Sequence, residues 1–208
     1  ITYSGIGIFT KEIDGKTFIS GVLAGLPADT AGCRVANAII SAGGAPFEPI
    51  GSFRGKEGEA VTLEIRRNAN GPVTSTSVRP QRIVPDDAFE SAMRDSARII
   101  ETNGQRVGYV HVWSYAGRNY QAILEEVLSE GKLKDADALV WDLRDGWGGA
   151  RPSFLRIFDP HGPTMTLTER HGGTETVGFR WQKPVVLLIN NGTRSGKEVL
   201  AYGFKKNG

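Results

Sequence analysis

The apolar residues of the first third of the chain fall in short runs that are separated by Gly, Asn and Asp. Their length, and the period-two alternation that is clearest in residues 61–65, are typical of β-strands. Strands are expected at residues 6–9, 18–23, 38–40, 61–65 and 73–78. Helical spacing is limited to residues 27–32 and 50–54. The pattern therefore predicts a small, mostly β domain over residues 1–84.

In residues 85–104 the apolar residues recur at the spacing of a helix and no longer alternate as in a strand. Asp86 and Asp87 are suited to cap a helix with a recurring apolar face, which Asn103-Gly104 would end. That face consists of Phe89, Ala92, Met93, Ser96, Ala97 and Ile100. We therefore expect a connector helix over this segment and a domain boundary close to it.

The remaining residues, 105–208, alternate between strand and helix patterns. Strands are expected at residues 107–112, 138–143 and 185–189, and helices at residues 120–128, 154–158 and 198–206. The first helix is expected to turn inward Tyr120, Ile123, Leu124, Val127 and Leu128. A crossover of this length joins parallel strands, so the first two strands should be parallel. Five consecutive apolar residues, 185–189, predict a fully buried strand. The fold class is thus α+β and multidomain, with a β-rich domain followed by an α/β domain of βαβ order.

Two polar turns follow strands of this second domain. Ser195 lies between the strand at residues 185–189 and the last helix, and Gly148-Gly149 follow the second strand. Ligands of open α/β sheets bind at the carboxyl ends of the strands, where both turns are expected. Two plainer interpretations stay open. Ser195 and Glu198 also fit the S-x-x-E capping box, and the glycine pair also fits an ordinary tight turn.

Composition and charge exclude several classes of partner. The chain holds 25 Lys and Arg against 23 Asp and Glu, without charged blocks, so nothing favours binding to nucleic acid or to an anionic membrane. No apolar run is long enough to span a membrane, and residues 1–30 lack the order of a signal peptide. A single cysteine, Cys33, excludes an internal disulfide, and three scattered histidines offer no zinc spacing. We expect no metal and no cofactor.

Four segments of the first domain resemble a PDZ domain of the kind that accompanies bacterial proteases. They are residues 5–8, 25–32, 38–43 and 55–66. The resemblance implies that the loop Gly5-Ile6-Gly7-Ile8 holds the terminal carboxylate of a peptide with its backbone N–H groups, while the neighbouring strand edge pairs with the peptide. The same four residues also fit a plain edge strand.

Two further segments resemble the motifs of the tail-specific, or C-terminal-processing, serine peptidases. Residues 142–149 resemble their D-L-R-x-N-x-G-G segment, and residues 191–198 resemble their G-[ST]-A-S-A-S-E segment. In that family a PDZ domain likewise precedes an α/β, crotonase-like core. Carried over by position, the resemblance implies that Ser195 is the nucleophile and that Gly148 and Gly196 donate the two oxyanion N–H groups.

The resemblance implies a serine endopeptidase that binds and cleaves unstructured C-terminal regions of proteins through an acyl-enzyme intermediate. Its partner would be a protein or peptide with a free C-terminus, and its location the periplasm or cell envelope. The general base would be a lysine beyond residue 208, so residues 1–208 alone are expected to be inactive.

Lys197 stands where that family has Ser, and it is expected to project to another face than Ser195. Two alternatives remain. One is a non-catalytic peptide-binding or scaffolding protein of the same fold. The other is a tricorn-like hydrolase in which His111 is the base, although the position of His111 within a strand favours a packed or surface residue.

Overall fold

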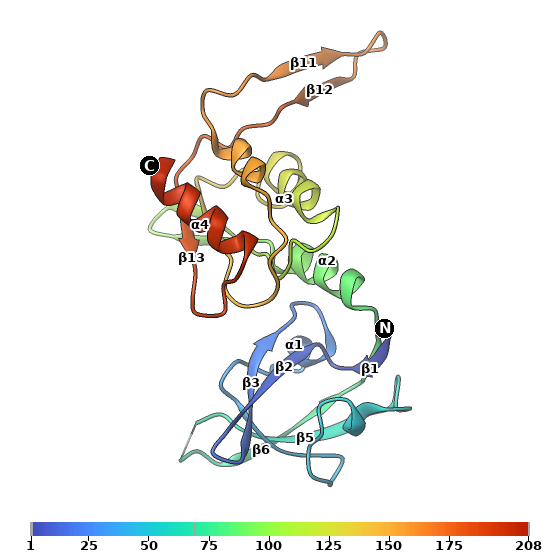
Figure 1. Ribbon diagram of the computed structural model, residues 1–208. Coiled ribbons are helices and arrows are strands. Elements are labelled where there is room, and N and C mark those ends of the chain that lie inside the picture. The colour runs from blue at the N-terminus through green and yellow to red at the C-terminus, as the bar shows by residue number, and fades with distance from the viewer. Residues whose placement is uncertain (1, 69, 208) are drawn as a thin grey trace. The chain divides into compact units, whose positions relative to one another are not determined.

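The computed structural model describes residues 2–68 and 70–207 of the chain. Internal contacts divide the chain into two compact units, residues 1–95 (unit 1) and residues 96–208 (unit 2). Both units combine β-sheet with helix (Figure 1). The chain is therefore a mixed α and β protein.

Unit 1 contains an antiparallel sheet of five strands in the order β2-β3-β4-β5-β6. The strands are β2 (Ile8–Ile13), β3 (Lys16–Val22), β4 (Ala38–Ala42), β5 (Val61–Arg66) and β6 (Val73–Val78). Each overlaps a predicted strand, although the first begins at Ile8 and not at Ile6. Outside this sheet, the short strands β1 (Tyr3–Gly5) and β7 (Gln81–Ile83), which were not predicted, pair with each other. The helical segments are α1 (Pro27–Thr30) and the 3₁₀ turn η1 (Gly51–Phe53).

One cluster of buried apolar side chains forms the core of unit 1. β5 contributes every second residue to it, Val61, Leu63 and Ile65, because alternate side chains of a strand point to the same face. Cys33 is a member of the cluster and is fully buried. Burial of a Val, Leu or Ile side chain contributes about 1.5–3 kcal/mol, so the alternation of apolar residues in β5 supplies part of the driving force for folding.

The predicted connector helix over residues 85–104 is only partly correct. Helix α2 spans Pro85–Ser96, and β8 (Arg98–Thr102) follows it as an antiparallel partner of β9 (Gln105–His111). Asn103 and Gly104 have positive φ values of 49° and 75°. Asn-Gly with two positive φ angles is the preferred two-residue turn of a β-hairpin. The dipeptide that was expected to end a helix therefore joins two strands.

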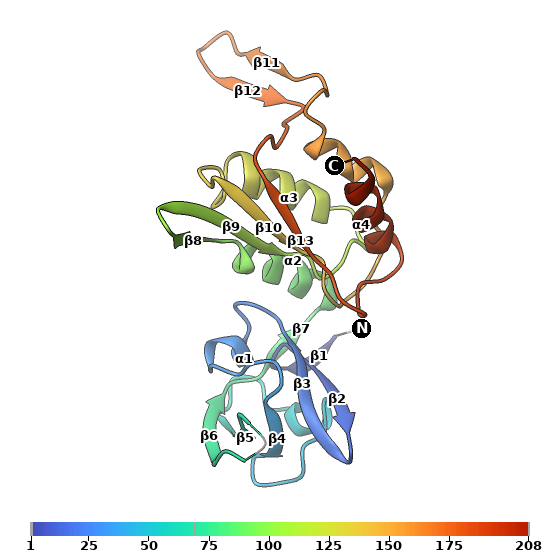
Figure 2. The same ribbon diagram turned by 90° about the vertical axis from the view of Figure 1, so that its left-hand side faces the viewer.

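Unit 2 contains a four-stranded sheet in the order β13-β10-β9-β8. β10 (Ala138–Asp142) is parallel to β9 and to β13 (Val185–Leu188), which confirms the predicted parallel pair. Helix α3 (Tyr120–Ser129) lies along one face of this sheet (Figure 2). Its buried residues are the five predicted ones, Tyr120, Ile123, Leu124, Val127 and Leu128. The 3₁₀ segment η2 (Pro152–Phe158) and helix α4 (Gly196–Asn207) complete the core of this unit.

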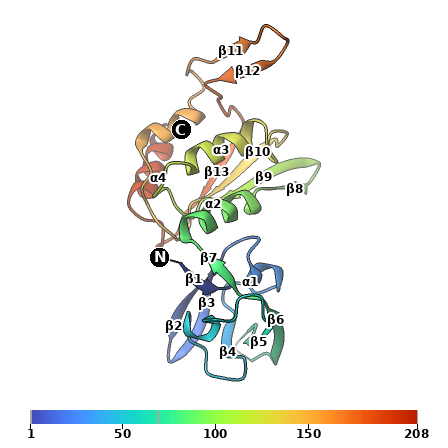
Figure 3. The same ribbon diagram turned by 90° about the vertical axis from the view of Figure 1, so that its right-hand side faces the viewer.

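Strand β13 is not fully buried, contrary to the prediction. Val186 is 58% exposed and Ile189, just past the strand, is 55% exposed. β13 is an edge strand among the described residues, so it lacks the neighbour that would cover it. A second exposed feature is the hairpin of β11 (Met165–Thr168) and β12 (Thr174–Val177), which extends away from the four-stranded sheet (Figure 3).

Candidate functional site

The two polar turns of unit 2 meet at one edge of its sheet. Asp142 at the end of β10 is in register with Leu188 at the end of β13. Beyond them, the Asn190 side chain accepts a hydrogen bond from the Asp145 N–H (3.1 Å) and donates one to the Asp145 carboxylate (3.1 Å). The Thr193 hydroxyl donates to the Leu143 carbonyl at 3.0 Å. These bonds join the turn after β10 to the turn that carries the serine.

Ser195 has an unusual backbone for the residue that precedes a helix. It is exposed, and its φ of 54° lies in the left-handed region. An ordinary N-cap residue is extended, and a non-glycine residue held in the left-handed region costs about 1–3 kcal/mol. The Ser195 N–H donates to a Glu198 carboxylate oxygen at 2.6 Å, which is half of a capping box. The capping contact is thus present, but in a strained conformation that a cap does not require.

The glycine turn lies directly against this serine. A Cβ on Gly148 would be 2.6 Å from the Ser195 Cβ and 3.1 Å from the Gly196 nitrogen. A Cβ on Gly196 would be 2.4 Å from the Ala150 carbonyl oxygen. Only glycine fits at either position without displacing backbone. The structure therefore brings together the three residues Ser195, Gly148 and Gly196 that the sequence indicated.

An open pocket lies beside Ser195. It is lined by Gly149, Ala150, Ser195, Gly196, Glu198, Val199 and Tyr202. As the first residue of α4, Gly196 has an N–H without an acceptor inside the helix, and the helix dipole adds positive potential there. An anion that forms next to Ser195 would therefore be stabilised.

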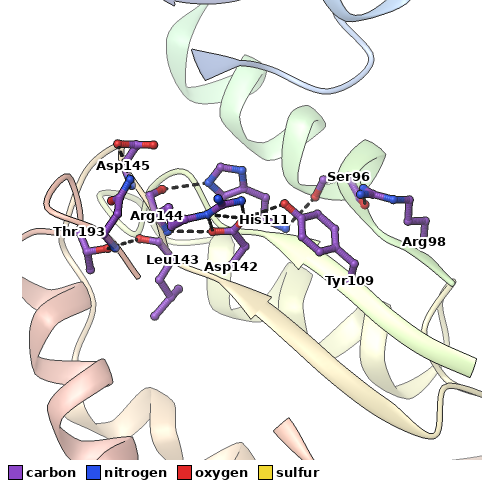
Figure 4. A network of polar contacts seen from close by, with 10 residues as sticks. Ser96, Arg98, Tyr109, His111, Asp142, Leu143, Arg144, Asp145 and Thr193 are labelled. Carbon is purple, nitrogen blue, oxygen red and sulfur yellow. Dashed lines mark hydrogen bonds and ion pairs between the residues drawn. The ribbon is translucent and has the colours of Figure 1, made fainter. Parts of the chain in front are cut away.

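Behind the turns lies a buried carboxylate, Asp142, within a polar network (Figure 4). Asp142 accepts hydrogen bonds from the Tyr109 hydroxyl at 2.7 Å and from the Arg144 guanidinium at 2.6 and 2.9 Å. Burial acts to raise the pKa of Asp142, but the hydrogen bonds from Arg144, the nearby His111 and the hydrogen bond from Tyr109 outweigh it, so this pKa lies below its ordinary value. Burial and the same carboxylate raise the pKa of Tyr109 to about 12. The carboxylate is a fixed charge that orients the first residues of the turn.

His111 belongs to this network and not to the pocket at Ser195. Its Nε2 lies 3.0 Å from the Arg144 carbonyl oxygen, and its ring is 4.0 Å from the Trp113 ring. Since a carbonyl oxygen only accepts, this nitrogen carries the proton. Burial lowers the pKa of His111. This position is consistent with the expectation that His111 is a packed or surface residue and not a catalytic one.

Lys197 projects away from the exposed Ser195, as expected, but its burial was not predicted from the sequence. Its side chain is fully buried, and its Nζ donates to the carbonyl oxygens of Val112, Trp113 and Asp145 at 3.0, 3.4 and 2.6 Å. A lysine in the first turn of a helix usually points to solvent. The missed signal is its spacing, because Lys197 lies three residues before the buried Leu200 and so shares its face.

The candidate carboxylate loop of unit 1, Gly5 to Ile8, begins at the last residue of β1 and ends at the first residue of β2. The carbonyl of Ile6 accepts the Ala28 N–H and the carbonyl of Gly7 accepts the Leu23 N–H, both at 2.9 Å, so these oxygens are turned into the unit. Gly7 has a φ of 77°, and a Cβ there would be 2.5 Å from the Leu26 side chain. β2, which follows, is an edge strand of the described sheet. An edge strand offers unpaired backbone groups to an extended peptide.

Among residues 2–68 and 70–207, no group of three or more His, Cys, Asp or Glu side chains is arranged to hold a metal ion. No helix in the same part of the chain is long and apolar enough to cross a membrane.

Comparison with known proteins identifies related chains. The model of the family described as "Peptidase family S41" matches residues 106–208. The chain is 26% identical to the carboxy-terminal processing protease CtpA of Bacillus subtilis over 99% of its own length and 45% of that protein. It is 28% identical to a carboxyl-terminal-processing protease of Picosynechococcus over 99% of its length and 51% of that protein. The chain thus spans about half the length of the curated relatives it matches.

Two solved structures share the fold. One is a photosystem II D1 C-terminal processing protease, with a TM-score of 0.54 and 18% identity over 98% of this chain and 58% of that one. The other is a putative S41 protease from Bacteroides fragilis, with a TM-score of 0.59 and 18% identity over 98% of this chain and 61% of that one.

Proposed function

Because the chain belongs to peptidase family S41 through residues 106–208, we propose that it is a serine endopeptidase that cleaves proteins in their unstructured C-terminal regions. The observation that carries the proposal is the contact of Gly148 with Ser195 and Gly196, together with the left-handed backbone of Ser195. A helix cap requires neither feature. A nucleophile that must project from a sharp turn beside two amide donors benefits from both.

The proposed reaction is acyl transfer through Ser195. Its Oγ forms a bond to the scissile carbonyl carbon and gives its proton to a general base, and the peptide C–N bond then breaks as the amine leaves with that proton. Water hydrolyses the resulting ester and restores the serine. The N–H groups of Gly148 and Gly196 would hold the negatively charged oxygen, with each donor contributing about 3 kcal/mol to transition-state stabilisation. We place the base, a lysine, outside residues 1–208.

Unit 1 is proposed to capture the substrate as a PDZ-like domain. The terminal carboxylate would bind the backbone N–H groups of Gly5 to Ile8, and the extended peptide would pair with the free edge of β2. The partner is then a protein with a free, unstructured C-terminus whose last residue is apolar. By its resemblance to this family, we place the protein in the periplasm or cell envelope.

Two other functions are weaker. A tricorn-like hydrolase would need His111 as base, but its Nε2 is engaged by the Arg144 carbonyl. A non-catalytic peptide-binding protein would keep both units, with Ser195 serving only as the cap whose N–H meets Glu198.

The deciding experiment is labelling of the full-length protein with a fluorophosphonate, followed by peptide mapping. We expect modification at Ser195, and loss of cleavage on the order of a million-fold in Ser195→Ala. Ser153→Ala, which changes another exposed serine, serves as the matched control and should stay active. A full-length protein that neither labels nor cleaves would favour the non-catalytic alternative. Equal labelling of residues 1–208 alone would contradict the placement of the base.

A further inference from the structure

The Lys197 ammonium joins three separate segments of unit 2. Two of its acceptors, the carbonyls of Val112 and Trp113, follow strand β9, and the third, the carbonyl of Asp145, belongs to the turn after β10. Lys197 itself is the second residue of α4. An ammonium group has three N–H donors, so three carbonyl acceptors use all of them.

A buried lysine at this position needs a reason. Leu200, on the same face of α4, is apolar and fully buried. An apolar side chain at position 197 would likewise cost less free energy to bury than a charged one. Burying a charge costs several kcal/mol unless it is well hydrogen-bonded. The carbonyls at the ends of β9 and β10 are acceptors that an apolar residue could not satisfy.

The same segments carry the glycine turn. The Trp147 N–H donates to the Trp113 carbonyl at 2.8 Å, and the Tyr115 N–H donates to the Gly148 carbonyl at 2.9 Å. The residues after β9 are therefore the support on which the turn lies. Lys197 binds both this support and the start of the turn, from the helix that begins next to Ser195.

From this geometry we infer that Lys197 is a positioning residue: it holds the turn of residues 145–148 against Ser195 and Gly196, and so keeps the two oxyanion N–H groups in place. The effect on catalysis rests on the proposed function. The tie, meaning the hydrogen bonds that join Lys197 to the turn and to the residues after β9, can be measured without it. Lys197 is not the general base, because its three protons are donated to carbonyls and its side chain has no exposure, whereas Ser195 is exposed.

The tie should depend on pH. Burial lowers the pKa of Lys197 to about 8; the nearby Asp142 and Asp145 act in the opposite direction, and Arg194 adds to the lowering. His111 also faces this charge, and burial lowers its own pKa, so it is neutral where Lys197 titrates. The buried site thus favours the neutral amine, so the free energy needed to open the turn and hydrate Lys197 should rise as the pH increases above 8.

The test is hydrogen exchange of the full-length protein at pH 7, read by mass spectrometry for peptides that cover residues 145–149. We expect Lys197→Met to lower the protection of these amides about tenfold, while Lys205→Met, at the exposed end of the same helix, changes nothing. For cleavage we expect kcat to fall about 10- to 100-fold with KM nearly unchanged.

Unchanged protection in a folded Lys197→Met variant would overturn the inference. If that variant does not fold, Lys197→Gln replaces it. The unsubstituted protein is also compared at pH 7 and pH 9, with protection corrected for intrinsic exchange. A gain of protection at pH 9 that is confined to residues 145–149 supports the tie, because closure of the turn favours the neutral amine, and equal protection at both pH values contradicts it. Absence of cleavage by the unsubstituted protein would refute the proposed function alone, because the exchange measurement does not depend on it.

Discussion

The candidate sites of the two units are built in different ways. The site of unit 1 would bind through backbone groups of four consecutive residues, Gly5 to Ile8, although Gly5 pairs with Gln81 and the Ile6 carbonyl accepts the Ala28 N–H. The site of unit 2 is assembled across the chain: Thr193 bonds to a residue 50 positions away and Lys197 to one 85 positions away. A local backbone site should respond to substitution gradually. A site that depends on several distant contacts should fail steeply when one of them is lost.

The sharpest way to test this contrast is Gly148→Ala. The added methyl would lie 2.6 Å from the Ser195 Cβ and 3.0 Å from the Arg194 carbonyl oxygen, so the turn must move away from the serine. We expect kcat of the full-length protein to fall about 100- to 1,000-fold, as for loss of an oxyanion donor. Gly173→Ala is the control, since its φ lies outside the left-handed region and its methyl would meet only the end of the exposed Glu169 side chain, at 2.9 Å. A loss of less than tenfold would show that the turn adapts and that the contrast is overstated.

A smaller effect is expected in unit 1. A peptide with a free carboxylate and an apolar last residue should bind about 10- to 100-fold more tightly than its amidated twin, because hydrogen bonds to a charged group contribute about 1.5–3 kcal/mol. Isothermal titration of both peptides measures the difference, and a peptide with a polar last residue tests whether the last side chain contributes. Equal affinities for the carboxylate and the amide would mean that the Gly5 to Ile8 loop does not read the terminus.

The smallest effect is a pH dependence from Asp142. Its pKa is lowered in the folded protein, so its contribution to stability is complete above its unfolded pKa of 3.8 and is lost as the pH falls through the folded value. Chemical unfolding at pH 7 and near pH 3 should therefore show a larger loss for the unsubstituted protein than for Asp142→Asn. At pH 7 this variant should be less stable by about 1–2 kcal/mol. The same pH dependence in both proteins would assign the acid sensitivity to other carboxylates.

Much of the fold follows from local patterns. The inward face of α3 was predicted residue by residue, because a helix on a sheet must bury one stripe, and the parallel pairing of β9 and β10 followed from the length of the crossover. The error at residues 98–102 has a clear cause. Ile99 and Ile100 fit a helical face as well as a strand, and only the two positive φ angles at Asn103-Gly104 separate a hairpin from a helix end.

The parts that escaped prediction depend on long-range contacts. The exposure of β13 depends on its position at the edge of the sheet. The five apolar residues 185–189 do not determine that position. Lys197 is a surface residue by type, and only the carbonyls of Val112 and Trp113, far away in sequence, make it a buried one. For Ser195 the residue type was visible in the sequence, but its left-handed backbone was not. Its catalytic role stays a prediction.

The location of Cys33 has a practical consequence. It is the single cysteine of the chain, it is fully buried in unit 1, and burial raises the pKa of its thiol. The four tryptophans all belong to unit 2; they are Trp113, Trp141, Trp147 and Trp181. A thiol-specific reagent therefore reacts at a rate set by the opening of unit 1, while indole fluorescence follows unit 2. The two units carry separate native reporters, so the order in which they unfold within residues 1–208 can be followed without substituting any residue.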